Sequence, residues 1–207
     1  MRCFYSQTGR SMIEMLGVLA IIAVLSVGGG IAGYSKAMEM YKEDKVIEEY
    51  SYMLTGFIEH LDNLRRNKYE RSTGMVDFAL SANIVPSVWT RLSSDYINDS
   101  FGNRLRIYMG ASGNLVIDFW MGGKTKKFDT KFCRKFLNKV AFPLHQTLKQ
   151  IDVHRNENGN LNGLIWKGDN FCSAGQKCLR DITLTEIDAA CKTCVEDREL
   201  CAVIFWL

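Results

Sequence analysis

Seven cysteines carry most of the reactive chemistry of this 207-residue chain, and six of them lie between residues 133 and 201. The six are Cys133, Cys172, Cys178, Cys191, Cys194 and Cys201, whereas Cys3 stands alone near the start. Clustered cysteines in a small domain are typical of disulfides formed in an oxidising compartment. Reduced core cysteines are the alternative, but an apolar role rarely calls for six cysteines in one region. We therefore expect a disulfide-bonded C-terminal third.

The sequence gives little support for metal binding, redox chemistry or catalysis by its cysteines and histidines. Cys191-Lys192-Thr193-Cys194 is a C-x-x-C motif, but its spacing to Cys172 and Cys178 misses the common zinc patterns. It also lacks the βαβ context of a thioredoxin-like site. No Gly-rich phosphate loop is present, and the three histidines are scattered: His60, His145 and His154. We expect no metal, no cofactor and no enzymatic activity.

A carboxylate at the edge of an apolar run is the second feature that could take part in chemistry. Residues 15–34 contain no charge, Glu14 directly precedes them, and Gly9 lies five positions before Glu14. As a helix the run would span about 30 Å, the thickness of a bilayer core. A secretory signal peptide has a shorter apolar core with a cleavage site behind it, so an uncleaved membrane span is the better interpretation.

The environment of Glu14 has two possible explanations. The carboxylate could be solvated just outside the span, where it would cap the helix. Alternatively, it could meet a positive charge inside an apolar assembly, because a buried carboxylate needs a cationic partner. Arg2, Arg10 and the initiator amine favour a cytoplasmic N-terminal side. The rest of the chain would then lie on the non-cytoplasmic side of the membrane, in agreement with the cysteines.

The pattern Gly9-Arg10-Ser11-Met12-Ile13-Glu14 followed by the apolar run resembles the type IV prepilin signature. In that family a prepilin peptidase cuts after the glycine and methylates the new N-terminal amine. The glutamate at the fifth mature position pairs with an N-terminal amine during filament growth. The resemblance implies a leader at 1–9, a cut between Gly9 and Arg10, methylation of Arg10 and an assembly role for Glu14. Family members usually carry a large apolar residue where this chain has Arg10.

One long helix is expected to follow the leader, over residues 10–68. No proline interrupts residues 12 to 68, and beyond the apolar run the large side chains recur at three- and four-residue steps. Those side chains are Val46, Ile47, Tyr50, Met53, Leu54, Phe57, Ile58, Leu61 and Leu64. Gly29 and Gly33 form a G-x-x-x-G pair that would permit close helix packing or add local flexibility.

Residues 69–207 are expected to form a globular head. A short helix is predicted near 75–82 within a loop, a hairpin over 104–109 and 115–120, and helices over 129–141 and 183–193. A Gly/Asn-rich loop is predicted at 156–163, where a solvated turn is favoured over a calcium loop, with a possible strand at 161–166. The terminal segment from Cys201 to Leu207 is predicted to be a central strand. The fold class is therefore α+β, with the long helix packed on an antiparallel sheet.

Several head segments resemble the type IVb pilins, which include the toxin-coregulated and bundle-forming pilins. These segments are Ile84-Val85-Pro86, Asp99-Ser100-Phe101-Gly102-Asn103 and the hairpin that follows, a helix cysteine, a late cysteine and the aromatic terminal strand. The short leader fits type IVa better, so the subfamily stays open. The resemblance implies a disulfide between Cys133 and Cys191. The other four cysteines could pair locally as Cys172–Cys178 and Cys194–Cys201.

The resemblance implies a subunit that is held in the inner membrane, with its head in the periplasm, and then polymerises into a helical surface filament. Its partners would be its own copies, the prepilin peptidase and the inner-membrane assembly machinery. The net charge of +3 with mixed signs gives no indication of nucleic-acid binding. Alternatives are a type II secretion pseudopilin, a single-span membrane protein with a disulfide-rich binding head, and a periplasmic thiol enzyme.

Overall fold

The computed structural model describes residues 12–67, 69, 72–122, 130–157, 160–193 and 200–207. Within these ranges it describes no side chains for residues 12–32, 121–122, 155–157, 160–162 and 200. The chain separates into two units, residues 1–42 and residues 43–207. A single 55-residue helix, α1 (Met12–Arg66), contributes to both units. The long helix expected from the uninterrupted apolar periodicity is thus present and ends two residues before the expected boundary.

An eight-stranded sheet forms the centre of residues 43–207, and every strand pair in it is antiparallel. Its order is β2-β3-β4-β5-β8-β6-β7, with β1 also paired to β4. The strands are β1 (Thr73–Gly74), β2 (Thr90–Arg91), β3 (Tyr96–Asn98), β4 (Arg104–Met109), β5 (Leu115–Gly122), β6 (Gln150–Glu157), β7 (Asn160–Lys167) and β8 (Leu200–Trp206). The expected α+β class, with an antiparallel sheet and disulfides, is confirmed.

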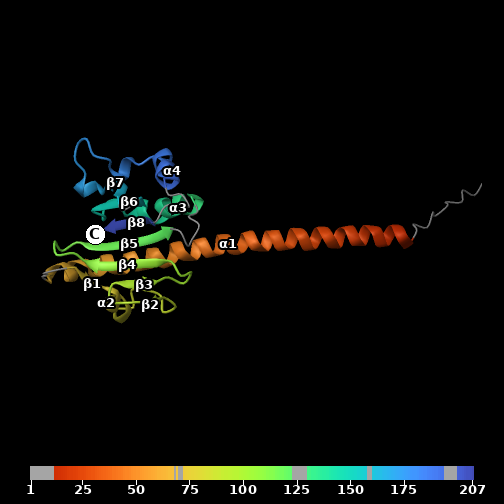
Figure 1. The fold of residues 1–207 in the computed structure, drawn as a ribbon, viewed down its shortest axis with the longest axis horizontal. Coiled ribbons are helices and arrows are strands. Elements are labelled where there is room, and N and C mark those ends of the chain that lie inside the picture. The colour runs from red at the N-terminus through yellow and green to blue at the C-terminus, as the bar shows by residue number, and fades with distance from the viewer. Residues whose placement is uncertain (1–11, 68, 70–71, 123–129, 158–159, 194–199) are drawn as a thin grey trace, which may run out of the picture. The chain divides into compact units, whose positions relative to one another are not determined.

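Three shorter helices accompany the sheet (Figure 1). They are α2 (Val76–Ser81), α3 (Thr130–Phe136) and α4 (Leu184–Lys192). Helix α3 continues as a π-helical turn at Leu137–Ala141 and a 3-10 turn at Phe142–Leu144. Thr183 and Glu186 form a complete capping box at the start of α4, which satisfies N–H groups that would otherwise lack partners. All three helices fall within the segments where helices were predicted.

The predicted hairpin is formed by β4 and β5, and the predicted central strand is β8. A turn from Gly110 to Asn114 joins β4 to β5, with Gly113 at a φ of 75°. Glycine adopts this left-handed conformation at no steric cost, so the turn needs it there. Strand β8 pairs with β5 on one side and β6 on the other. The last strand of the sequence is therefore a central strand of the sheet.

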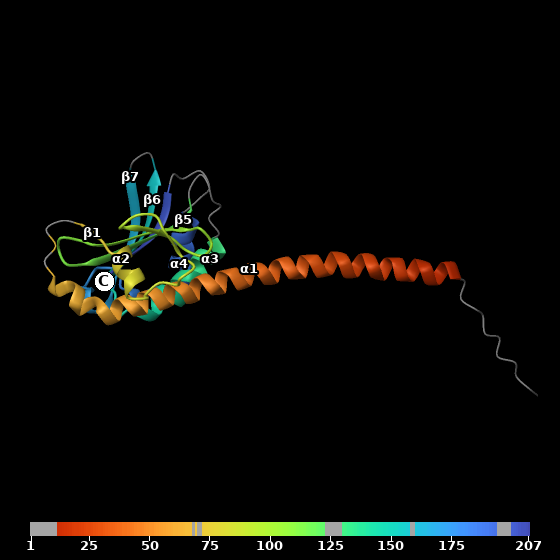
Figure 2. The same ribbon diagram turned by 90° about the horizontal axis from the view of Figure 1, so that it is seen from below.

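The core lies between one face of the sheet and the helices (Figure 2). Of the helices that line the core, α1 contributes the longest buried face. Seven of the nine apolar residues expected on that face are buried, and Ile47 and Ile58 are partly buried against them. Inner-face residues alternate along the strands, as Leu105, Ile107 and Met109 do on β4. Fully burying a large apolar side chain contributes roughly 1.5–3 kcal/mol, so this helix face is a main source of the head's stability.

Two expectations about the head are wrong. The segment 75–100, expected to be a loop apart from the short helix near 75–82, also contains strands β2 and β3, which form by pairing with each other and with β4. The loop predicted at 156–163 is the end of a hairpin, since β6 extends to Glu157 and β7 begins at Asn160. The strand expected at 161–166 is present as β7, and β6 had not been predicted at all. Polar residues continue in β6 because its backbone still pairs with β8 as far as Asn156. Cross-strand hydrogen bonds thus override the local turn preference of asparagine.

Candidate functional site

The residues predicted to carry processing and assembly lie at the start of the chain, at the edge of what the structure describes. Gly9 and Arg10 lie outside the described residues. Glu14 and Gly29 lie in α1, and their side chains are not described. Gly33 is exposed, and a Cβ placed on it would meet no heavy atom within 4 Å. The roles of these residues in cleavage, methylation, assembly and helix packing remain predictions.

Where side chains are described, no helix is long and apolar enough to cross a membrane. The span predicted at 15–34 lies, as far as residue 32, outside that part of the chain.

An aromatic cluster centred on Tyr50 holds α1 to the sheet. The Tyr50 ring lies 4.4 Å from Phe119 of β5 and 5.4 Å from Phe136 of α3, measured between centroids. Phe136 in turn contacts Phe205 of β8 at 5.9 Å. Aromatic pairs at such distances add about 0.5–1.5 kcal/mol each beyond burial. One residue of α1 therefore connects the helix, the central strands and α3.

A buried carboxylate fixes the loop between β3 and β4 to the same tyrosine. Asp99 is 4% exposed; it accepts hydrogen bonds from the backbone N–H groups of Phe101 and Asn103 and from the side chains of Asn103 and Tyr50. Burial raises the pKa of Asp99, and these hydrogen bonds oppose that rise. Gly102 has a φ of 77°, which allows the loop to fold back over the carboxylate. The motif Asp99 to Asn103 is thus a self-contained turn anchored on α1.

Glu49, the neighbour of Tyr50, forms a second anchor. It accepts hydrogen bonds from the indole N–H of Trp89 at 2.8 Å and the hydroxyl of Ser100 at 2.7 Å. With 7% exposure it is one of the few buried acidic side chains among the described residues. Buried charges are retained when hydrogen bonds satisfy them. Glu49 and Asp99 together attach the segment from 84 to 103 to the helix, a role that the apolar periodicity of α1 could not reveal.

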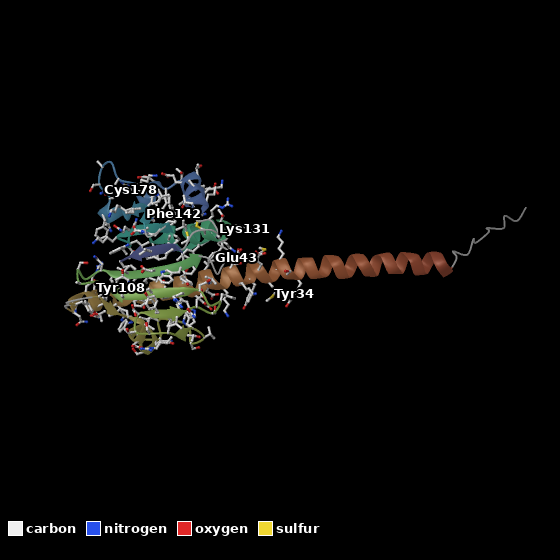
Figure 3. All side chains as sticks on the ribbon, in the orientation of Figure 1. Tyr34, Glu43, Tyr108, Lys131, Phe142 and Cys178 are labelled. Carbon is white, nitrogen blue, oxygen red and sulfur yellow. A yellow bond between two sulfur atoms is a disulfide. The ribbon has the colours of Figure 1, made fainter. Side chains whose placement is uncertain are left out.

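Ion pairs join α3 to α1 where the head begins. The Lys135 ammonium lies 3.0 Å from Glu43 and 2.9 Å from Asp44; Figure 3 labels Glu43 on α1 and Lys131 on α3. Burial lowers the pKa of Lys135, but hydrogen bonds to Asp44 and Glu43 outweigh burial and leave it raised. This contact sets the position of the first helix turn that belongs to residues 43–207.

Two disulfides are described in full. Cys133 of α3 and Cys191 of α4 are bonded across 58 residues of sequence, with their Cα atoms 5.8 Å apart. Cys172 and Cys178 close a loop with a sequence separation of 6. The first is the pairing that the family resemblance implies, and the second is the local pairing considered possible. Cys201 is also disulfide-bonded, and its expected partner, Cys194, lies outside the described residues.

The pairing of Cys191 with Cys133 removes it from a C-x-x-C site. Among the residues described, no three side chains of His, Cys, Asp or Glu are grouped to hold a metal. The histidines serve local contacts: His145 lies 2.7 Å from Asp169, His154 lies 3.4 Å from Asp152, and His60 packs edge-on against Phe78. The cysteines whose side chains are described are all disulfide-bonded.

Comparison of the chain with protein-family models, with characterised proteins and with solved structures found no match. The case for a function therefore rests on the residues and the fold.

Proposed function

We propose that this chain is a type IV pilin-like filament subunit. Prepilin peptidase cuts it after Gly9, residues 15–34 hold it in the inner membrane, and its N-terminal helix polymerises it into a surface filament. The observation that carries the proposal is the continuity of α1 from Met12 to Arg66. The same helix contains Glu14 and the apolar run and, without a break, supplies the buried residues of an α+β head.

The chemistry of this arrangement follows from the cost of an unpaired charge. When subunits leave the bilayer and their apolar helices bundle, Glu14 loses water and needs a cation. The free amine created by cleavage before Arg10 supplies one. A subunit whose carboxylate lies level with an amine is held in register, whereas a misplaced subunit keeps a buried unpaired charge. Cleavage and assembly are thereby coupled.

The head supports the same proposal. The Cys133–Cys191 disulfide is the bridge expected from the type IVb resemblance, and the Asp99 turn gives the segment Asp99 to Asn103 a defined structural role. A secretion pseudopilin shares the N-terminal pattern, but the cysteine-rich C-terminal region favours a pilin. A membrane-anchored binding protein that never polymerises would not need Gly9 and Glu14 at this spacing.

The assembly role of Glu14 is testable with Glu14→Gln, which keeps the shape of the side chain and removes its charge. We expect the variant to be cleaved normally but to give filament yields lower by about a hundredfold or more, because breaking a buried ion pair costs about 3–5 kcal/mol. Filaments sheared from cells are quantified by immunoblot and electron microscopy. Glu48→Gln, at an exposed position of the same helix, is the matched control and should assemble normally. Full assembly of the Glu14 variant would refute this mechanism.

A further inference from the structure

A carboxylate lies on the face of the sheet that points away from the core. Asp118 on β5 is flanked in sequence by Ile117 and Phe119, both fully buried in the core, so its own side chain projects to the opposite face. Across the sheet it is opposite Arg106 of β4 on one side and Ile204 of β8 on the other. Asp152 of β6 is the next residue in this row. Four adjacent strands thus bring three charged groups into one line.

The neighbouring acids in this cluster are hydrogen-bonded, whereas Asp118 is not. Asp95 accepts from Ser93 and Arg106. Asp152 accepts from the indole N–H of Trp206 and the amide of Gln150 and lies beside His154. Within the described part of the chain, the side chain of Asp118 forms no hydrogen bond or ion pair. It has lost much of its hydration without gaining a direct partner, which disfavours its charged form.

The charged and titratable groups around Asp118 come from four strands. They are Tyr96 of β3, Arg106 and Tyr108 of β4, Asp152 and His154 of β6, and Lys167 of β7, which donates to Gln150; β8 contributes Ile204 and Trp206. Burial raises the pKa of Asp118 to about 6, Arg106 and His154 oppose the rise, and Asp152 adds to it. Figure 3 labels Tyr108 on β4. Arg106 is itself held between the rings of Tyr96 and Tyr108, at 5.7 and 4.3 Å.

His154 of β6 lies in the same cluster. Its ring lies against Gly163 of β7, where a Cβ would come within 3.2–3.3 Å of the imidazole atoms. Its Nδ1 is buried without a hydrogen-bond partner, and its Nε2 lies 3.4 Å from Asp152. The cluster around Asp118 therefore contains a second partly paired polar side chain. Protonation of Asp118 would remove a desolvated negative charge from this face.

We propose that Asp118 makes this sheet face responsive to acid: uptake of a proton by its carboxylate under mildly acidic conditions stabilises the head and makes the face more positive. The inference concerns the fold and is independent of filament assembly. Its sign follows from linkage. Asp118 has a folded pKa of about 6, above its ordinary value of 3.8, so the folded state holds this proton more tightly. The contribution of Asp118 to stability is fully present below pH 3.8 and is lost as the pH rises through 6.

The test compares the wild type with Asp118→Asn, using the full chain in detergent micelles and denaturant unfolding from pH 4 to pH 7.5. We expect equal stability near pH 4. Near pH 7.5 the folding equilibrium constant of the variant should be about a hundredfold higher, because asparagine never carries the desolvated charge. The matched control is Asp181→Asn, whose carboxylate is 70% exposed and should leave the pH profile of the wild type unchanged.

A difference between Asp118→Asn and the wild type that does not vary with pH would overturn the proposal. The carboxyl carbons of ¹³C-aspartate-labelled wild-type protein provide a second measurement that needs no variant. Titration near pH 6 of the carboxyl carbon assigned to Asp118 supports the proposal. Titration of every aspartate below pH 5 refutes it, even if Asp118→Asn fails to fold.

Discussion

Replacing Cys133 and Cys191 together by alanine is expected to lower the free energy of unfolding of the head by about 4 kcal/mol. The bridge closes a loop with a sequence separation of 58, so its loss restores a large conformational freedom to the unfolded chain. Both cysteines are fully buried, and they join α3 to α4 beside the aromatic cluster of Tyr50. A typical domain is stable by only about 5–15 kcal/mol, so this loss would remove a large fraction of the total.

The matched control is the double substitution of Cys172 and Cys178 by alanine. That bridge has a sequence separation of only 6, and the same relation gives about 2 kcal/mol. Urea unfolding followed by tryptophan fluorescence compares the two variants with the wild type. A loss at Cys172–Cys178 equal to or greater than that at Cys133–Cys191 would contradict loop closure as the source of the stability.

Substituting Gly168 by alanine is expected to destabilise the head by about 3 kcal/mol, the upper end of the usual cost of overpacking. Gly168 directly follows β7, and its backbone passes close to Leu148, which lies just before β6. A Cβ added to Gly168 would overlap the carbonyl oxygen of Leu148. Its φ of −64° is ordinary, so the effect would come from this overlap alone. Any shift would also disturb Asp169, whose N–H donates to His145 O and whose carboxylate pairs with the His145 ring.

Gly110→Ala is the comparison for Gly168→Ala. The nearest heavy atoms to a Cβ at Gly110 are 3.7 and 3.8 Å away, which is ordinary contact distance. Its unfolding free energy should stay within about 1 kcal/mol of the wild type. Thermal unfolding of both variants measures the difference, and similar midpoints would show that the close approach at Leu148 relaxes at little cost.

The elements predicted correctly from the sequence are those whose signal is local. The apolar face of α1 repeats over many turns, the β4–β5 hairpin has alternating residues around a Gly/Asn turn, and α4 begins with a Thr-x-x-Glu cap. The Cys133–Cys191 pairing came from family resemblance, because spacing alone allows many pairings. Each of these features can be recognised in the sequence without knowledge of the tertiary structure.

The missed elements depend on contacts between distant segments. Strands β1, β2 and β3 have two or three residues each and exist because they pair with neighbours in the sheet. Strand β6 combines the buried Ile151 and Val153 with polar residues that resemble a loop. The buried position of Glu49 and the partly buried position of Asp118 are equally non-local, since acidic residues are normally exposed and only the packed sheet and helix remove their water.

The intact mass of the membrane- or filament-associated protein, from a host with an active prepilin peptidase, tests the central claim most directly. We predict loss of residues 1–9, so that the chain begins at Arg10, and a mass shift on reduction that corresponds to three disulfides. Gly9→Val should retain the leader under the same conditions. Persistence of the full chain with Met1 and Cys3 in place, despite an active peptidase, would contradict the pilin proposal and favour a membrane-anchored binding protein.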